Sequence, residues 1–93
     1  MAIQSFESGD TEALFDGCRV KRFVNIESTA MRKLALLNRA ATLNDLRVPP
    51  GNGLEALRGD RAGQYSIRIN QQWRLCFTWS ALGPASVEIV DYH

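Results

Sequence analysis

The chain of 93 residues contains only one histidine and two cysteines, and this scarcity limits the metal sites that it can form. Cys18 and Cys76 form no C-x-x-C pair. With a single histidine they fall short of a four-ligand zinc site unless carboxylates contribute. We therefore expect two reduced thiols, with Cys76 packed in an apolar strand. We expect no metal ion and no cofactor.

Long apolar runs are also absent. No run approaches the ~18–20 residues needed to span a bilayer, and the first residues lack the basic and apolar regions of a secretory signal. We therefore expect a cytoplasmic protein with no membrane partner. Apolar residues make up 45% and charged residues 23% of the chain, as in an ordinary globular protein. The length predicts one domain, residues 1–93, with a single core.

The net charge of +1 hides an uneven distribution of charge. Residues 1–18 contain acids and no base, whereas all eleven lysines and arginines lie between residues 19 and 74. A basic segment of this kind can mark a surface that binds a polyanion. The same cations can also simply solvate exposed faces, and charge alone favours that second interpretation.

Helical signals fill the first half of the chain. Residues 3–6 are typical of a short edge strand, and Asp10 is a suitable N-cap for a short helix that stops at Gly17. A second helix is expected from a cap at Asn25 or Ser28 to residue 40 or 41. Its apolar residues recur at helical spacing. They are Ile26, Ala30, Leu34, Leu37 and Ala41.

A break separates the two halves of the chain. Thr42 and Asp45 have the spacing of a capping box and predict one further helical turn. Residues 48–53 then contain two prolines and two glycines, which excludes helix and central strand. We interpret this segment as a hinge-like loop.

After the loop the apolar residues alternate with a period of two. Strands are expected from residue 54 to near residue 59 and at residues 65–69, 73–79 and 87–93, joined by short turns that indicate an antiparallel meander. Helices followed by strands predict an α+β fold, in which an N-terminal strand and the helices pack on one face of a mainly antiparallel C-terminal sheet. The alternation places Ser66, Arg68, Arg74 and Thr78 together on the opposite, polar face.

The last strand ends on three groups that can bind, donate or accept protons, namely Asp91, Tyr92 and His93. Cleaving RNA without a metal needs two proton-transfer groups and a fixed cation. Histidine titrates in the right range and arginine holds phosphate oxygens. Glu55 is a further candidate base. No Gly-rich phosphate loop, G-x-S-x-G or H-E-x-x-H motif is present.

Each of these residues also has a simpler interpretation. Asp91 can be a surface charge, Tyr92 a packing residue and His93 a frayed end or the remnant of a tag. Arg74 can pair with Glu88 across the sheet, Glu55 can face solvent, and Asp60 and Arg61 are typical of a turn. Residue spacing alone therefore leaves the enzymatic interpretation open.

An ordered set of residues over nearly the whole chain resembles the HigB-type toxins of the RelE superfamily. The set comprises Leu54-Glu55-Ala56-Leu57-Arg58-Gly59-Asp60-Arg61, Gly63, Tyr65-Ser66-Ile67, Asn70, Trp73-Arg74-Leu75, Phe77, Val87, Ile89 and Asp91-Tyr92-His93. Residues 3–6 and the helix containing Arg32-Lys33-Leu34 and Leu37 fit as well. The resemblance implies a compact RelE-like fold.

The resemblance also implies a function. The protein would be the toxin of a type II toxin–antitoxin system and would cut mRNA in the ribosomal A site without a metal. The resemblance further implies a HigA-type helix-turn-helix antitoxin, with operator DNA bound only through that antitoxin. The rival hypotheses are a non-catalytic RelE-fold protein that binds antitoxin or RNA, and a nuclease that acts on free RNA.

Roles follow for individual residues of this sequence. The resemblance implies His93 as the general acid, Asp91 as the base or the group orienting His93, and Tyr92 as a substrate contact. Arg58 and Arg74 would stabilise the phosphorane. Some family members have a histidine where this chain has Glu55, so which group is the base stays open. The cations expected to contact ribosomal RNA are Arg19, Lys21, Arg22, Arg32, Lys33 and Arg39.

Overall fold

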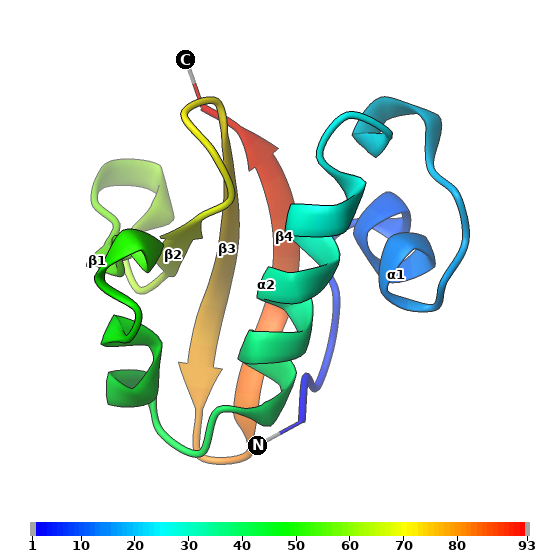
Figure 1. The fold of residues 1–93 in the computed structure, drawn as a ribbon. Helices are drawn as coiled ribbons and strands as arrows, with labels where there is room; N and C mark the ends of the chain where they lie inside the picture. Colours follow the sequence, from blue (N-terminus) through cyan, green and yellow to red (C-terminus); the bar gives the residue numbers. More distant parts are fainter. Residues whose placement is uncertain (1, 93) are drawn as a thin grey trace.

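A computed structural model describes residues 2–92 and has an α+β architecture of two layers. Its helices are α1 (Gly9–Phe15) and α2 (Glu27–Arg39), and its strands are β1 (Glu55–Ala56), β2 (Tyr65–Arg68), β3 (Trp73–Ser80) and β4 (Gly83–Asp91). The strands form one antiparallel sheet in the order β1-β2-β3-β4. In Figure 1, α2 crosses one face of this sheet with α1 beside it, which confirms the predicted fold class.

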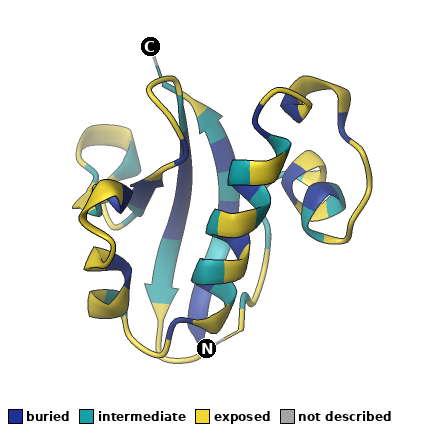
Figure 2. Ribbon diagram, viewed as in Figure 1, coloured by how far each residue is buried: buried dark blue, intermediate teal, exposed yellow. Residues whose placement is uncertain are grey.

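The core lies between α2 and the sheet. Ala30, Leu34 and Leu37 are fully buried on the inner side of α2, as the apolar spacing predicted. They belong to one cluster with Ile67 and Leu75 of the sheet, and Figure 2 shows the buried stripe on the side of α2 that faces the strands. Each such leucine contributes about 1.5–3 kcal/mol relative to an exposed one. No helix within residues 2–92 has the length and apolarity to cross a membrane.

The helix ends differ from the sequence prediction. Ser8, not Asp10, caps α1, because its Oγ accepts a hydrogen bond from the Thr11 amide at 3.1 Å. Asp10 instead lies in the first turn, where its charge complements the helix dipole. The predicted caps Asn25 and Ser28 are both wrong, since α2 begins after Ile26 without a side-chain cap.

The N-terminal segment is not the edge strand that the sequence predicted. It makes a single parallel bridge between Phe6 and Val87 of β4. The amide of Glu7 donates to the Val87 carbonyl at 2.9 Å, and the Val87 amide donates to the Ser5 carbonyl at 3.1 Å. The chain turns into α1 at Gly9, which leaves room for little more pairing.

The connection between α2 and the sheet consists of 3₁₀ turns. The capping box is confirmed, since Asp45 donates its amide to Thr42 Oγ1 and its carboxylate accepts from the Thr42 amide, opening the turn Leu43–Arg47. A second short turn, Pro50–Asn52, lies within the segment predicted to be free of helix. Gly53 follows with φ of 54°, a left-handed conformation that favours glycine.

Candidate functional site

The strand register gathers polar side chains on the sheet face that α2 does not cover. Glu55 pairs with Ser66, Ser66 with Cys76 and Arg68 with Arg74. The predicted alternation is therefore confirmed. The centre of this polar face is closed to solvent, because Ser66 and Cys76 are fully buried and Arg74 is 8% exposed.

Arg74 of β3 is held by groups from three segments. Its Nε donates to Ser66 Oγ of β2 at 2.8 Å, and its Nη2 donates to the Gly53 carbonyl at 2.6 Å. Nη2 also lies 3.6 Å from Oε1 of Glu55. Nη1 makes no hydrogen bond within residues 2–92. The guanidinium is thus fixed in orientation and retains two N–H groups that can bind an anion.

Glu55 is placed beside Arg74 by the short pairing of β1 with β2. Its side chain is 56% exposed, so a solvent-borne substrate can reach the carboxylate. The predicted alternative, an ion pair between Arg74 and Glu88, is wrong. Glu88 of β4 lies instead 3.6 Å from Nη1 of Arg61.

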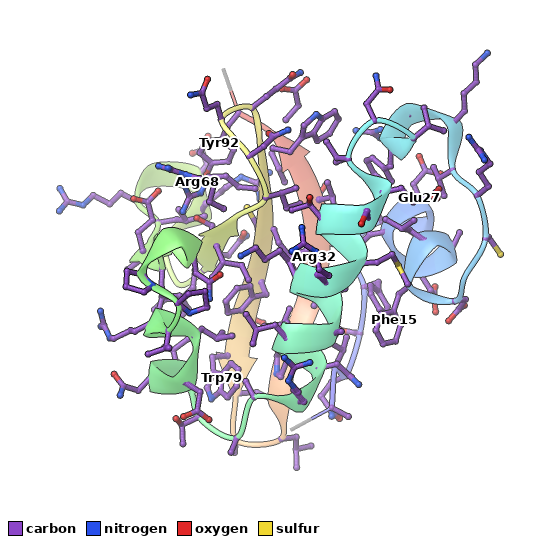
Figure 3. The ribbon with its side chains drawn as sticks, viewed as in Figure 1. Phe15, Glu27, Arg32, Arg68, Trp79 and Tyr92 are labelled. Carbon is purple, nitrogen blue, oxygen red and sulfur yellow. The ribbon has the colours of Figure 1, made fainter. Side chains whose placement is uncertain are left out.

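Tyr92 follows β4 and returns to the same polar face. Its backbone amide donates to the Gln72 carbonyl at 2.5 Å. Burial raises the pKa of Tyr92, and the adjacent Cys76 thiol raises it further, while Arg61 and Arg74 act in the opposite direction. The phenol therefore keeps its proton at neutral pH and can donate a hydrogen bond. Figure 3 shows Tyr92 close to Arg68 of β2 in this view.

Asp91, the last residue of β4, does not join this group. Asp91 pairs with Trp73, so its side chain lies on the sheet face that α2 covers. Arg74 lies on the opposite, polar face. The Oδ2 atom of Asp91 accepts a hydrogen bond from Gln72 Nε2 at 3.2 Å. The prediction for His93 lies outside the described residues.

Arg61 also lies near the site, although its sequence context predicted only a turn residue. It lies in the 3₁₀ turn Gly59–Arg61, where its Nη1 also donates to Gln64 Oε1 at 3.0 Å. Its charge lowers the pKa values of Cys76 and Tyr92 against the effect of burial. Arg58, at the start of the same turn, is exposed and has no side-chain partner within residues 2–92. One feature of the sequence could have indicated that Arg61 lies near the site, namely its position between two strands that both contribute to the polar face.

A cavity of about 560 Å³ lies beside Arg61 on the polar side of the sheet. Its lining residues are Glu7, Asp60, Arg61, Gln64, Thr78, Ser86 and Glu88. Among residues 2–92, no three or more His, Cys, Asp and Glu side chains are grouped so as to hold a metal ion.

The six cations predicted to contact ribosomal RNA do not surround Arg74. Arg19, Lys21 and Arg22 lie in the connection between α1 and α2, beside α1 in Figure 1. Arg22 lies 3.5 Å from Asp10 and covers the rings of Phe23 and Trp73.

On α2, Arg39 is exposed near the C-terminus and Arg32 donates to Thr29 at 3.2 Å. Figure 3 shows Arg32 on α2, apart from Arg68 and Tyr92. Within residues 2–92, Lys33 is the one cation of the six that contacts the loop before β1, by donating to Asn52 next to Gly53.

Known proteins share both the sequence and the fold. Over 55 residues, 59% of this chain, it is 49% identical to Toxin HigB-1 of Vibrio cholerae and 40% identical to an uncharacterized protein of Haemophilus influenzae. These matches span 58% and 54% of the two relatives, which is less than two thirds of each.

A solved structure, the YoeB/ParE toxin from Agrobacterium tumefaciens, superposes with a TM-score of 0.53 at 21% identity. The superposition covers 100% of this chain and 99% of that one, and it shows a shared fold. The family model described as the RelE-like toxin HigB of type II toxin–antitoxin systems matches residues 4–93. The chain therefore belongs to the HigB-like toxin family, as its sequence motifs predicted.

Proposed function

We propose that the protein is the toxin of a type II toxin–antitoxin system and a ribosome-dependent mRNA endonuclease that needs no metal. The arrangement of Arg74 carries the proposal. A fixed guanidinium, whose Nη1 has no hydrogen-bond partner within residues 2–92, lies beside an exposed carboxylate, Glu55, and a protonated phenol, Tyr92. A preoriented cation is suited to holding the charge that develops on a phosphorane, because it needs no reorganisation during the reaction.

The chemistry divides among these groups. Glu55 takes the proton of the ribose 2′-hydroxyl as its oxygen attacks phosphorus, and Arg74 binds a non-bridging oxygen of the phosphorane. The bond between phosphorus and the 5′-oxygen then breaks, leaving a 2′,3′-cyclic phosphate. The leaving oxygen takes a proton from His93, the general acid. Tyr92 donates a hydrogen bond to the substrate or stacks on a base.

The register favours Glu55 over Asp91 as the general base. Glu55 lies 3.6 Å from Arg74, whereas Asp91 has the parity of the helix-covered face. Asp91 then keeps its other expected role, that of orienting His93. Arg58, exposed at the start of the turn after β1, adds a second cation for phosphate.

The proposed partners are the ribosome, mRNA and a HigA-type helix-turn-helix antitoxin, which binds operator DNA for the complex. Membership of the HigB-like toxin family supports these assignments. The protein would then act in the cytoplasm. Arg19, Lys21, Arg22, Arg32 and Arg39 would contact ribosomal RNA, and such contacts weaken as salt is raised because they release counterions.

The test is cleavage of mRNA on purified ribosomes, with the cut ends mapped. Arg74→Lys removes the fork that Ser66 and Gly53 orient, and we expect kcat to fall by about 10²–10³. Arg47→Lys is the control, since Arg47 is exposed and its side chain bonds to Asn44 alone among the residues that the structure describes. Unchanged cutting by a folded Arg74→Lys protein would contradict the proposed role.

A non-catalytic binding protein is the second candidate. The pairing of Glu55 with Arg74 favours it, because the carboxylate neutralises part of the positive charge that a phosphorane would need. That protein would bind antitoxin or ribosomes and leave mRNA intact. A nuclease acting on free RNA would cut equally well when ribosomes are omitted.

A further inference from the structure

A buried polar group connects α2 to the loop that holds Arg74. Asn52 is fully buried, and its Oδ1 accepts a hydrogen bond from Lys33 Nζ at 2.5 Å. Its Nδ2 donates to the carbonyls of Leu46 at 3.1 Å and Val48 at 3.3 Å. Every polar atom of this amide is therefore used, and the loop is pinned from inside.

Lys33 determines which way the Asn52 amide faces. An ammonium group only donates, so it requires Oδ1 on its side and leaves Nδ2 for the two carbonyls. The reversed amide would set Nδ2 against the ammonium and Oδ1 against two carbonyl oxygens. Burial lowers the pKa of Lys33, and nearby Arg32 lowers it further. Lys33 is half-buried, whereas Arg32 and Arg39 of the same helix are exposed.

The pinned loop ends on a contact with the candidate site. The residue after Asn52 is Gly53, whose carbonyl accepts the 2.6 Å hydrogen bond from Arg74 Nη2. Gly53, with φ of 54°, is bonded directly to Asn52, so the position of its carbonyl follows that of the buried Asn52. A displacement of Asn52 therefore changes where Arg74 Nη2 finds its acceptor.

We propose that Lys33 and Asn52 are positioning residues of the site. They fix the loop so that the Gly53 carbonyl orients the Arg74 guanidinium for phosphate binding. This inference rests on the proposed function, and it replaces the expected role of Lys33 as a contact to ribosomal RNA. It also gives α2 a second task besides covering the core.

The experiment compares Lys33→Met in the natural background and in Arg74→Lys. In the natural background we expect kcat for mRNA cleavage to fall about tenfold or more, because small misplacements of catalytic groups are costly. KM for the ribosome should stay unchanged. In the Arg74→Lys background, Lys33→Met should cause no further loss. Arg47→Met is the matched control, a base lost next to the same loop.

Three results would overturn the inference. A raised KM with unchanged kcat would make Lys33 a ribosome contact. Equal losses in both backgrounds would make its role merely structural. An unchanged kcat in the natural background would remove Lys33 from the site. Lys33→Arg, which keeps a donor, should restore most of the rate, and Lys33→Gln serves the same test if Lys33→Met does not fold.

A second readout separates this inference from the proposed function. The ¹H–¹⁵N resonance of Arg74 Nε, which donates to Ser66, should shift in Lys33→Met and not in Arg47→Met. If the natural protein cuts no mRNA but this resonance shifts, the positioning inference stands and the nuclease proposal fails. If the resonance does not move, the positioning inference fails whatever the activity.

Discussion

The two faces of the sheet are both buried at their centres, but by different means. On one face, Ile67 and Leu75 are covered by the aliphatic side chains of α2. On the other, Ser66, Arg74 and Cys76 are buried among polar partners from β1, the loop at Gly53 and Tyr92. Apolar burial needs only matching volume and tolerates exchange, whereas a buried charge needs particular partners in particular places.

The largest stability change is expected on the helix-covered face. Leu34→Ala leaves a cavity where a fully buried side chain stood, which should lower the free energy of unfolding by about 2–5 kcal/mol. Leu36→Ala, at a half-buried position of the same helix, should cost less. Denaturant unfolding measures both. If Leu34→Ala cost no more than Leu36→Ala, α2 would not cover the core as described.

The polar face should lose less stability and more function. Ser66→Ala removes the acceptor for Arg74 Nε and leaves a buried N–H unpaired, which should cost about 1–3 kcal/mol. It should also lower kcat, because the guanidinium loses one of its supports. Leu34→Ala should leave kcat per folded molecule unchanged. If Ser66→Ala and Leu34→Ala changed kcat equally, the two faces of the sheet would not differ in function.

Ser80→Ala is the control for Ser66→Ala. The Ser80 hydroxyl donates to the Gly83 carbonyl at 2.8 Å, but Ser80 is the exposed last residue of β3, where water can replace the bond. We expect a loss of less than about 1 kcal/mol. If Ser80→Ala lowered the free energy of unfolding as much as Ser66→Ala, burial of the hydrogen-bond partner would not explain the effect of Ser66→Ala.

The smallest expected effect is on cysteine reactivity, which measures how well the polar face excludes solvent. Burial raises the pKa of the Cys76 thiol, whereas Cys18 is exposed. Because the thiolate is the reactive form, iodoacetamide should modify Cys18 first and leave Cys76 unmodified in the folded protein. Mass spectrometry of peptides measures the two sites. Tyr92→Ala should speed the reaction of Cys76, and equal rates at both cysteines would show an open face.

Local patterns in the sequence were sufficient for the two helices, the sheet strands and their faces, but not for the N-terminal segment or the helix caps. The spacing of Leu34 and Leu37 predicted the buried side of α2, and Thr42 with Asp45 predicted the turn that follows. Period-two alternation placed Ser66 and Arg74 on one face of an antiparallel sheet. These features are repeated over a few residues, and helix and strand geometry converts such spacing directly into direction.

The tertiary structure alone decided which polar groups meet. Arg74 finds Gly53 and Glu55, which are 21 and 19 positions away in the sequence, and not Glu88 on the neighbouring strand. The strand register places Asp91 on the face that α2 covers, away from Arg74. The path of the loop before β1 brings Asn52 within hydrogen-bonding distance of Lys33. Such contacts depend on register and loop path, which no periodicity records, because a shift of one residue reverses every side chain of a strand.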